Sequence, residues 1–359
     1  MTSSKNYFKN RMSKQRVTLT LTACLSLNLG LAFLAKGAET VPASVAPPEA
    51  QGQAPKRELQ VLVVMGAAGD PLYQPRFEKE ATLWRDACAK GRAHCHVIGL
   101  DAEDANKPDA VQLKGWLEEA SAKPPQQALW VVLIGHGTFD GRESKFNLRG
   151  PDVSSTDMAG WMKPFQSEVA VIQTASASAP FLKALTGPKR VLISATKSAD
   201  EVFYTRFGQF FAEAVTGAKE PDLDQDGEVS LLEAFLWSSK QVDRFFETEG
   251  RLATEHALLE DNGDGVGSRA EAFDGLHSKP VAVAQGKVAE GVLARQWSLL
   301  PGPEEMLLTE EARKRRDELE RSVEALRARR AGLAKEAYYA ELEKLMLKIA
   351  RIYGEKGAS

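Results

Sequence analysis

Long apolar runs alternate with helical patterns through residues 58–240. The runs are rich in β-branched residues, which is typical of strands buried on both faces of a sheet. The alternation predicts an α/β fold in which a parallel sheet carries helices on both faces. The predicted strands cover residues 59–65, 96–100, 131–134, 169–172 and 190–195.

Apolar residues at three- and four-residue spacing lie between these strands. Phe77, Ala81 and Trp84 follow this spacing behind the first strand and form one face of a helix. Asp109 precedes a second such stretch, where its carboxylate is suited to cap the first turn. The predicted helices cover residues 77–88, 111–120, 156–165, 181–185 and 203–215.

The C-terminal segment, residues 304–359, repeats the helical spacing with a narrow apolar stripe. Gly332 interrupts the pattern and predicts a helical hairpin, with one long helix as the alternative. Such a stripe suits a coiled-coil partner or docking on the main domain. Residues 276–303 contain three prolines and are interpreted as a connector behind an α/β domain over 58–275.

The N-terminal residues have the organisation of a secretory signal peptide over residues 1–38. Five basic residues precede a charge-free apolar stretch, 17–34, and small residues follow at Gly37 and Ala38. We therefore expect export to the periplasm, cell envelope or medium, without a permanent membrane span. A single membrane anchor and lipidation at Cys24 are the alternatives. Residues 39–57 are predicted to be a proline-rich linker.

The composition argues against one class of partner but does not decide whether the cysteines form a disulfide. A net charge of −3, without a basic patch, argues against a nucleic-acid partner. Cys88 and Cys95 remain after cleavage of the signal peptide. Export permits a disulfide between them, and two reduced thiols are an equal interpretation.

Two consecutive predicted strands end in residues suited to chemistry. The first stops at Gly135-His136-Gly137, which leaves an imidazole at the carboxyl end of a strand. The next is followed by a small polar cluster, residues 173–178. Open α/β sheets place their active sites at this edge. An incidental histidine in a strand-to-loop turn is the simpler interpretation of the first motif alone.

These motifs resemble those of the caspase/legumain-like (clan CD) cysteine peptidases, over roughly residues 58–240. His136 matches the catalytic histidine of that family, and Ala175 matches the small residue before the nucleophile. Ser176-Ala177-Ser178-Ala179 stands where the family has Cys-x-Ser-Gly, so serine replaces the nucleophilic cysteine. The resemblance implies a caspase-like fold, a peptide or protein ligand, and Ser176 with His136 as a vestigial dyad.

The serine substitution predicts absent or very low peptidase activity. A serine hydroxyl is not ionised at neutral pH and needs a histidine that a third group, normally a carboxylate, orients. Asp140 and Asp152 are the nearest acids in the sequence. The turn 175–179 also offers backbone N–H donors for a binding cleft without chemistry. An active hydrolase that uses Ser176 and a structural envelope protein are the alternatives.

Residues 222–233, DLDQDGEVSLLE, fit the EF-hand calcium loop at each diagnostic position. Carboxylates occupy positions 1, 3 and 5, glycine follows at position 6, and a glutamate closes the loop. Helices over 203–215 and 231–246 are expected to flank it. The predicted Ca²⁺ ligands are Asp222, Asp224, Asp226, Glu228, Ser230 and Glu233.

A second, degenerate loop covers residues 260–271. Its first position is glutamate and its eighth is glycine, so a weak ion site and an Asx-rich turn are equally compatible with it. The candidate ligands are Glu260, Asn262, Asp264 and Glu271.

Overall fold

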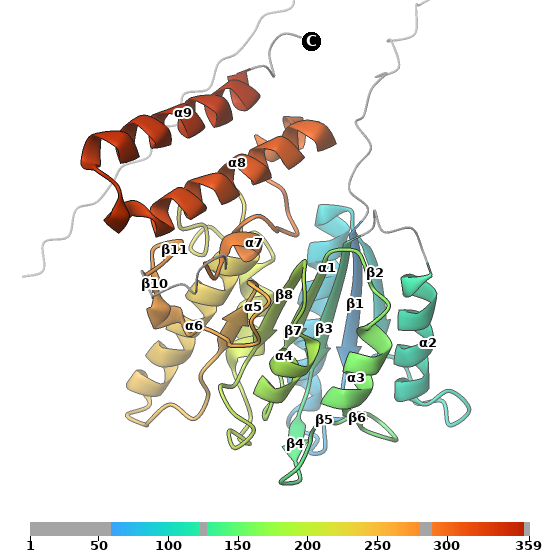
Figure 1. Ribbon diagram of the computed structural model, residues 1–359. Helices are drawn as coiled ribbons and strands as arrows, with labels where there is room; N and C mark the ends of the chain where they lie inside the picture. The colour runs from blue at the N-terminus through green and yellow to red at the C-terminus, as the bar shows by residue number, and fades with distance from the viewer. Residues whose placement is uncertain (1–58, 123–127, 280–288, 355–359) are drawn as a thin grey trace, which may run out of the picture. The chain divides into compact units, whose positions relative to one another are not determined.

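A six-stranded sheet forms the centre of the protein in a computed structural model, which describes residues 59–122, 128–279 and 289–354. The strand order is β2-β1-β3-β7-β8-β9, and Figure 1 labels the first five of these strands. Only β9 runs antiparallel to its neighbour, β8. This arrangement confirms the predicted α/β class. The strands are β1 (Leu59–Met65), β2 (His94–Ile98), β3 (Ala128–Ile134), β7 (Val169–Gln173), β8 (Arg190–Ser194) and β9 (Leu258–Glu260).

Helices cover both faces of this sheet because side chains alternate along its strands. In β1, Val61 and Val63 belong to one buried cluster, and Leu62 belongs to the other. The first cluster includes residues of α1 (Gln74–Gly91), α5 (Phe207–Ala214) and α6 (Leu231–Thr248). The second includes residues of α2 (Asp109–Ser121), α3 (Ser155–Met162) and α4 (Ala179–Leu185).

Asp109 does not cap α2 as predicted. The N-cap residue is Pro108, and the Asp109 carboxylate instead accepts two hydrogen bonds from Arg149, at 2.8 and 2.9 Å. A bidentate partner binds this buried carboxylate more strongly than one backbone N–H does, so the tertiary contact decides its direction.

Short strands and helices follow the carboxyl end of β3 and the end of β9. A small antiparallel sheet follows β3 directly and contains β4 (Gly137–Phe139), β5 (Ser144–Phe146) and β6 (Val153–Ser154). The later elements are η1 (Ala270–Ala272), β10 (Phe273–Asp274), β11 (His277–Ser278) and α7 (Val292–Arg295).

The segment interpreted as a connector is part of the packed core. Ala294, Trp297 and Leu299 are buried in the same cluster as α1 and α5. The segment is therefore not a free linker, and the prolines at its end lie where the chain leaves the α/β domain.

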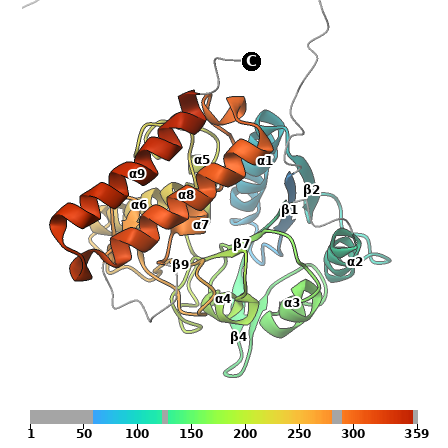
Figure 2. The ribbon, with the colours of Figure 1, turned by 45° about the horizontal axis from the view of Figure 1, so that its top comes forward.

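The C-terminal residues form a helical hairpin, as the break at Gly332 predicts. The order is η2 (Glu305–Leu307), α8 (Glu310–Ala328), η3 (Arg330–Gly332) and α9 (Lys335–Gly354), and the two long helices lie side by side (Figure 2). Glu324 of α8 pairs with Arg295 at 3.2 Å, and Glu320 accepts from Gln296 at 3.1 Å. A coiled-coil partner stays a prediction.

The two cysteines are free thiols. Cys88 is buried in α1 and its side chain hydrogen-bonds that of Cys95 in β2, a contact that raises the pKa of Cys88 together with burial. The predicted signal peptide and linker lie outside the described residues. Within the described ranges, no helix has both the length and the apolar character that crossing a bilayer requires.

Candidate functional site

The two strand ends singled out in the sequence are neighbours. β3 and β7 pair in parallel with Leu133 opposite Gln173. Thr174 donates its N–H and its hydroxyl to the Leu133 carbonyl oxygen, at 3.0 and 2.9 Å. The segments that carry His136 and Ser176 therefore leave the sheet side by side.

The His136 imidazole is half-buried in an aromatic environment. Its ring meets Tyr73 edge-on at a centroid distance of 4.6 Å and Phe77 at 5.2 Å, both from the start of α1. Burial lowers the pKa of His136, and a hydrogen bond to the Ala68 carbonyl opposes this only in part. The lowered pKa favours the neutral form of the ring.

The Ser176 hydroxyl is engaged by backbone. Its side chain is buried, with the residue 4% exposed. The hydroxyl donates to the Gly137 carbonyl oxygen at 2.9 Å and accepts from the Gly137 N–H at 3.1 Å. Because a hydroxyl has one proton, that proton goes to Gly137 and not to the His136 ring.

The turn after β7 uses its backbone donors internally. Ala177 has a left-handed backbone, φ 51°, and its N–H donates to the Glu201 carbonyl oxygen at 2.8 Å. The Ser178 N–H donates to Thr196 Oγ1 at 2.8 Å, and the Ala175 N–H to Gln173 Oε1 at 3.2 Å. These three N–H groups are thus committed to protein acceptors.

Asp140 and Asp152, the two acids considered as the carboxylate that would orient His136, stabilise turns of the small sheet. Asp140 is exposed and accepts from the N–H groups of Arg142 and Glu143, each at 2.9 Å. Asp152 accepts from Asn147 Nδ2 at 3.0 Å and from the Leu148 N–H at 3.1 Å. Both carboxylates therefore have local structural partners.

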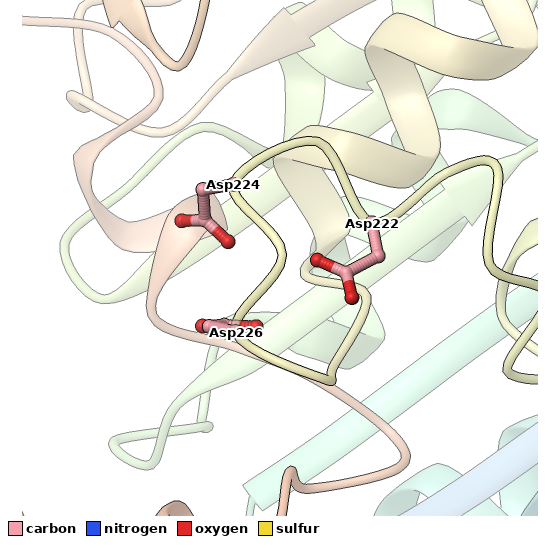
Figure 3. A group of neighbouring side chains, drawn as sticks. All are labelled: Asp222, Asp224 and Asp226. Carbon is pink, nitrogen blue, oxygen red and sulfur yellow. The ribbon is translucent and has the colours of Figure 1, made fainter.

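The predicted calcium loop gathers its aspartates. Asp222, Asp224 and Asp226 each bring one carboxylate oxygen within 4.8 Å of the other two (Figure 3). Gly227 has φ 89° and donates its N–H to Asp222 Oδ2 at 3.1 Å, which closes the loop on its first residue. Asp222 Oδ1 is buried and has no hydrogen-bond partner in the part of the chain that the structure describes.

The later loop residues connect the loop to neighbouring elements. Ser230 and Glu233 form a capping box at the start of α6, and Glu233 Oε1 also accepts from the Leu223 N–H at 2.8 Å. Glu228 turns to Gly302, whose N–H donates to it at 2.8 Å, and burial raises the pKa of Glu228 to about 7. Glu233 therefore borders the aspartates, whereas Glu228 points to the segment 276–303, where Ser298 and Gly302 donate to it.

The helix before the loop differs from the prediction. α5 begins at Phe207 and ends at Ala214, so residues 215–221 separate it from Asp222. The Glu255 carboxylate accepts from the N–H groups of Arg206 and Phe207, each contact at 2.9 to 3.1 Å, and thereby fixes the start of the helix. The helix after the loop, α6, begins at Leu231 as predicted.

The second loop gathers a different set of acids from the one the sequence pattern indicates. Glu260 and Asp264 bring oxygens within 4.8 Å of each other and of Glu290, which sequence reasoning missed. Glu271 lies instead in η1, where it is exposed and pairs with Arg269 at 2.5 Å. Asn262 Oδ1 accepts from the Asp264 N–H at 2.9 Å.

Glu290 carried no sequence signal, because it lies in the stretch interpreted as a connector. Burial raises its pKa to about 10, and the negative charges of Asp261, Glu260 and Asp264 act in the same direction.

No protein-family model matches the sequence, and no curated protein matches it. Among solved structures, the initiator caspase Dronc of Drosophila is similar over 59% of this chain and 82% of its own, with 11% identity and a TM-score of 0.39. Protein GSU0716 from Geobacter sulfurreducens is similar over 56% and 92%, with 12% identity and a TM-score of 0.39. Caspase-1 from Spodoptera frugiperda is similar over 62% and 93%, with 7% identity and a TM-score of 0.37. These likenesses are too distant to assign the chain to a family, and the fold rests on its own strand order.

Proposed function

We propose that this chain is an exported calcium-binding protein whose α/β domain has a caspase/legumain-like architecture without peptidase activity. The observation that carries the proposal is the gathering of three aspartate oxygens within 4.8 Å in the loop 222–233. Without peptidase activity, the α/β domain would bind a peptide or protein ligand.

Electrostatics favours a cation in this loop. Three carboxylates at such short separations repel one another, and the energy falls when a divalent cation lies among them. Oxygen-only ligands suit a hard cation such as Ca²⁺. The buried Asp222 Oδ1, which no donor among the described residues meets, is available to such an ion.

The capping box limits the affinity. Bidentate ligation by Glu233 requires its carboxylate to turn from the N–H groups of Leu223 and Ser230, each of which donates to it at 2.8 Å. Exchanging these bonds for the cation costs free energy, so we expect binding in the range of roughly 10⁻⁴ to 10⁻³ M, as in extracellular modules.

The strand-end geometry supports inactivity. A serine nucleophile needs its proton directed to a histidine that a carboxylate orients. Here the Ser176 proton is donated to Gly137, and His136 bonds a backbone carbonyl instead of an acid. The topology supports the architecture, because a parallel sheet with one antiparallel edge strand carries both strand-end motifs on adjacent strands.

Calcium titration calorimetry on the mature protein tests the proposal. Asp224→Asn keeps the size of an exposed side chain and removes one negative charge from the cluster. The calcium affinity of this loop should therefore fall at least tenfold. Glu220→Gln, an exposed acid just outside the loop, is the matched control. Equal binding by the wild type and Asp224→Asn would refute calcium binding at this loop.

A further inference from the structure

The second loop has the same backbone conformation as the first at two positions. Gly263 and Gly265 have φ 78° and 73°, at the places where Gln225 and Gly227 have φ 63° and 89°. The Gly265 N–H points to Glu260 Oε1 at 3.4 Å, as the Gly227 N–H points to Asp222. The loop 260–265 therefore folds in the manner of the calcium loop despite its degenerate sequence.

Glu260 brings an uncompensated oxygen into this loop. The residue is 0% exposed. Its Oε1 accepts from the Gly263 N–H at 2.6 Å, whereas Oε2 is buried and makes no hydrogen bond of normal geometry within the described ranges. The Thr186 hydroxyl is a neighbouring donor, but it also lacks a bond of normal geometry. Leaving a buried carboxylate oxygen unpaired is costly, and such an atom calls for a proton or a cation.

Glu290 adds a second uncompensated carboxylate from a distant segment. Both of its oxygens are buried and make no hydrogen bond of normal geometry among the residues that the structure describes. The Asp261 backbone N–H lowers the pKa of Glu290 only as the smallest of the effects on it. One oxygen from each of Glu260, Asp264 and Glu290 lies within 4.8 Å of the other two. Three carboxylates converge here, and two of them have buried oxygens that make no hydrogen bond of normal geometry among the described residues.

The segment that carries Glu290 is fixed beside the loop by Asp261. This buried aspartate accepts from the Gly291 N–H at 2.7 Å through Oδ1 and from the Ala294 N–H at 2.9 Å through Oδ2. Because Asp261 directly follows Glu260, the same two hydrogen bonds that hold the start of α7 also place Glu290 opposite the loop.

The neighbouring cationic side chain is used elsewhere. The negative charge of Glu260 acts to raise the pKa of Arg190. The Arg190 guanidinium, however, donates to the carbonyl oxygens of Leu185 and Met162, at 2.5 and 2.8 Å. The negative charge of the cluster is therefore not balanced by an ion pair with this arginine.

We infer that Glu260, Asp264 and Glu290 form a second calcium site, in which Glu290 supplies the closing carboxylate that the sequence pattern assigns to Glu271. All three ligands are hard oxygens. Glu260 is buried, and Asp264 and Glu290 are half-buried. Ca²⁺ accepts irregular coordination by protein oxygens, whereas Mg²⁺ demands octahedral geometry and retains several waters. This site goes beyond the proposed function, which rests on the loop 222–233 alone.

Two isosteric variants separate the two possible closing ligands. Calorimetric titration of the mature protein with Ca²⁺ should give two sites for the wild type and for Glu271→Gln. Glu290→Gln should lose one site, or weaken it at least tenfold, and should lose the corresponding calcium-dependent rise in Tm. The metal-free Glu290→Gln protein should be at least as stable as the wild type, because an amide cannot ionise and the change therefore removes an ionisable group from a buried acidic cluster.

The outcomes also distinguish this site from the first loop. A single wild-type site that disappears in Asp224→Asn would overturn the inference and leave the proposed function standing. A site that survives in Asp224→Asn and disappears in Glu290→Gln supports the inference on its own. Loss of the second site in Glu271→Gln but not in Glu290→Gln overturns it as well. If Glu290→Gln does not fold, Asp264→Asn is expected to lose the same site, and two retained sites in that variant would count against the inference.

Discussion

The hydroxyl of Ser176 and the backbone of Gly137 bond each other in both directions, at 2.9 and 3.1 Å. This exchange joins the loops that follow β3 and β7, directly beside His136. A hydroxyl serves as donor and acceptor at once, whereas a thiol is weak in both roles. Ser176 therefore has a structural function that a cysteine would perform poorly.

Removing the hydroxyl should cost stability without a change in activity. Ser176→Ala leaves the buried N–H and C=O groups of Gly137 without this partner, so the free energy of unfolding should fall by about 1–3 kcal/mol. Urea denaturation measures the change. Ser322→Ala, on the exposed side of α8, should alter stability by less than about 0.5 kcal/mol. An equal effect of the two changes would contradict the structural role of Ser176.

Peptidase activity should be absent in the wild type. Digestion of a broad peptide library in millimolar calcium should give the same background for the wild type, Ser176→Ala and His136→Ala. Ser176→Cys tests whether the nucleophile alone is missing, since a thiolate needs less assistance from the histidine. Wild-type cleavage that disappears in both alanine variants would identify an active Ser176/His136 pair.

Gly137 should tolerate no side chain. A Cβ at this position would lie 2.1 Å from the Ser176 carbonyl oxygen, and backbone on both sides has little room to move. We expect Gly137→Ala to lower the free energy of unfolding by more than about 2 kcal/mol. Gly115→Ala is the control, because nothing lies within 4 Å of its added methyl and it should stabilise α2 by about 0.5–1 kcal/mol. Similar melting temperatures for the two variants would rule out the close approach.

The central strands were predictable because both faces of each are covered, so their sequences are continuous apolar runs. β9 has three residues and β6 has two, too few to form a pattern. The pairing of the two strand ends followed from chain order. The direction of the Ser176 hydroxyl did not, since a contact across the sheet with Gly137 decides it.

The acidic loops divide in the same way. The three aspartates within residues 222–226 are local in sequence, so their gathering was predictable. Glu290 reaches its loop through the bonds that Asp261 makes to Gly291 and Ala294, which no spacing rule encodes. Tertiary contacts therefore supply the part of the candidate sites that the sequence pattern lacks.

Export should remove the signal peptide. The first ~38 residues are expected to be absent from protein recovered from the cell envelope or medium, because a basic start, an apolar stretch and small residues are recognised and cleaved. Intact-mass spectrometry identifies the new N-terminus. A chain that begins at Cys24 and partitions with membranes would indicate lipidation, and an intact Met1 on a cytosolic species would exclude export.

Glu80 should make the protein less stable as pH rises. Burial raises the pKa of this α1 carboxyl to about 8 from an ordinary 4.5, and Glu213 and Glu255 add to the shift against Lys79. Between these values the folded state binds more protons than the unfolded state, so the free energy of unfolding falls with increasing pH. This loss of stability begins near the pKa of Glu80 in the unfolded state and is complete once the pH passes its pKa in the folded state.

The Glu80→Gln variant isolates this effect. Its side chain keeps the shape of the protonated acid and cannot ionise, so the two proteins should be similarly stable at pH 5. At pH 8 the variant should be more stable by on the order of 3 kcal/mol, as expected for a pKa shift of this size. Urea denaturation at both pH values, in buffer with EGTA to remove calcium, gives the difference. Glu228, whose pKa burial raises to about 7, contributes equally to both proteins and cancels. The pKa of Glu255 is also raised to about 7, and its repulsion with Glu80 is part of the difference that is measured. A stability difference that is the same at pH 5 and pH 8 would mean that Glu80 is ionised in the folded protein.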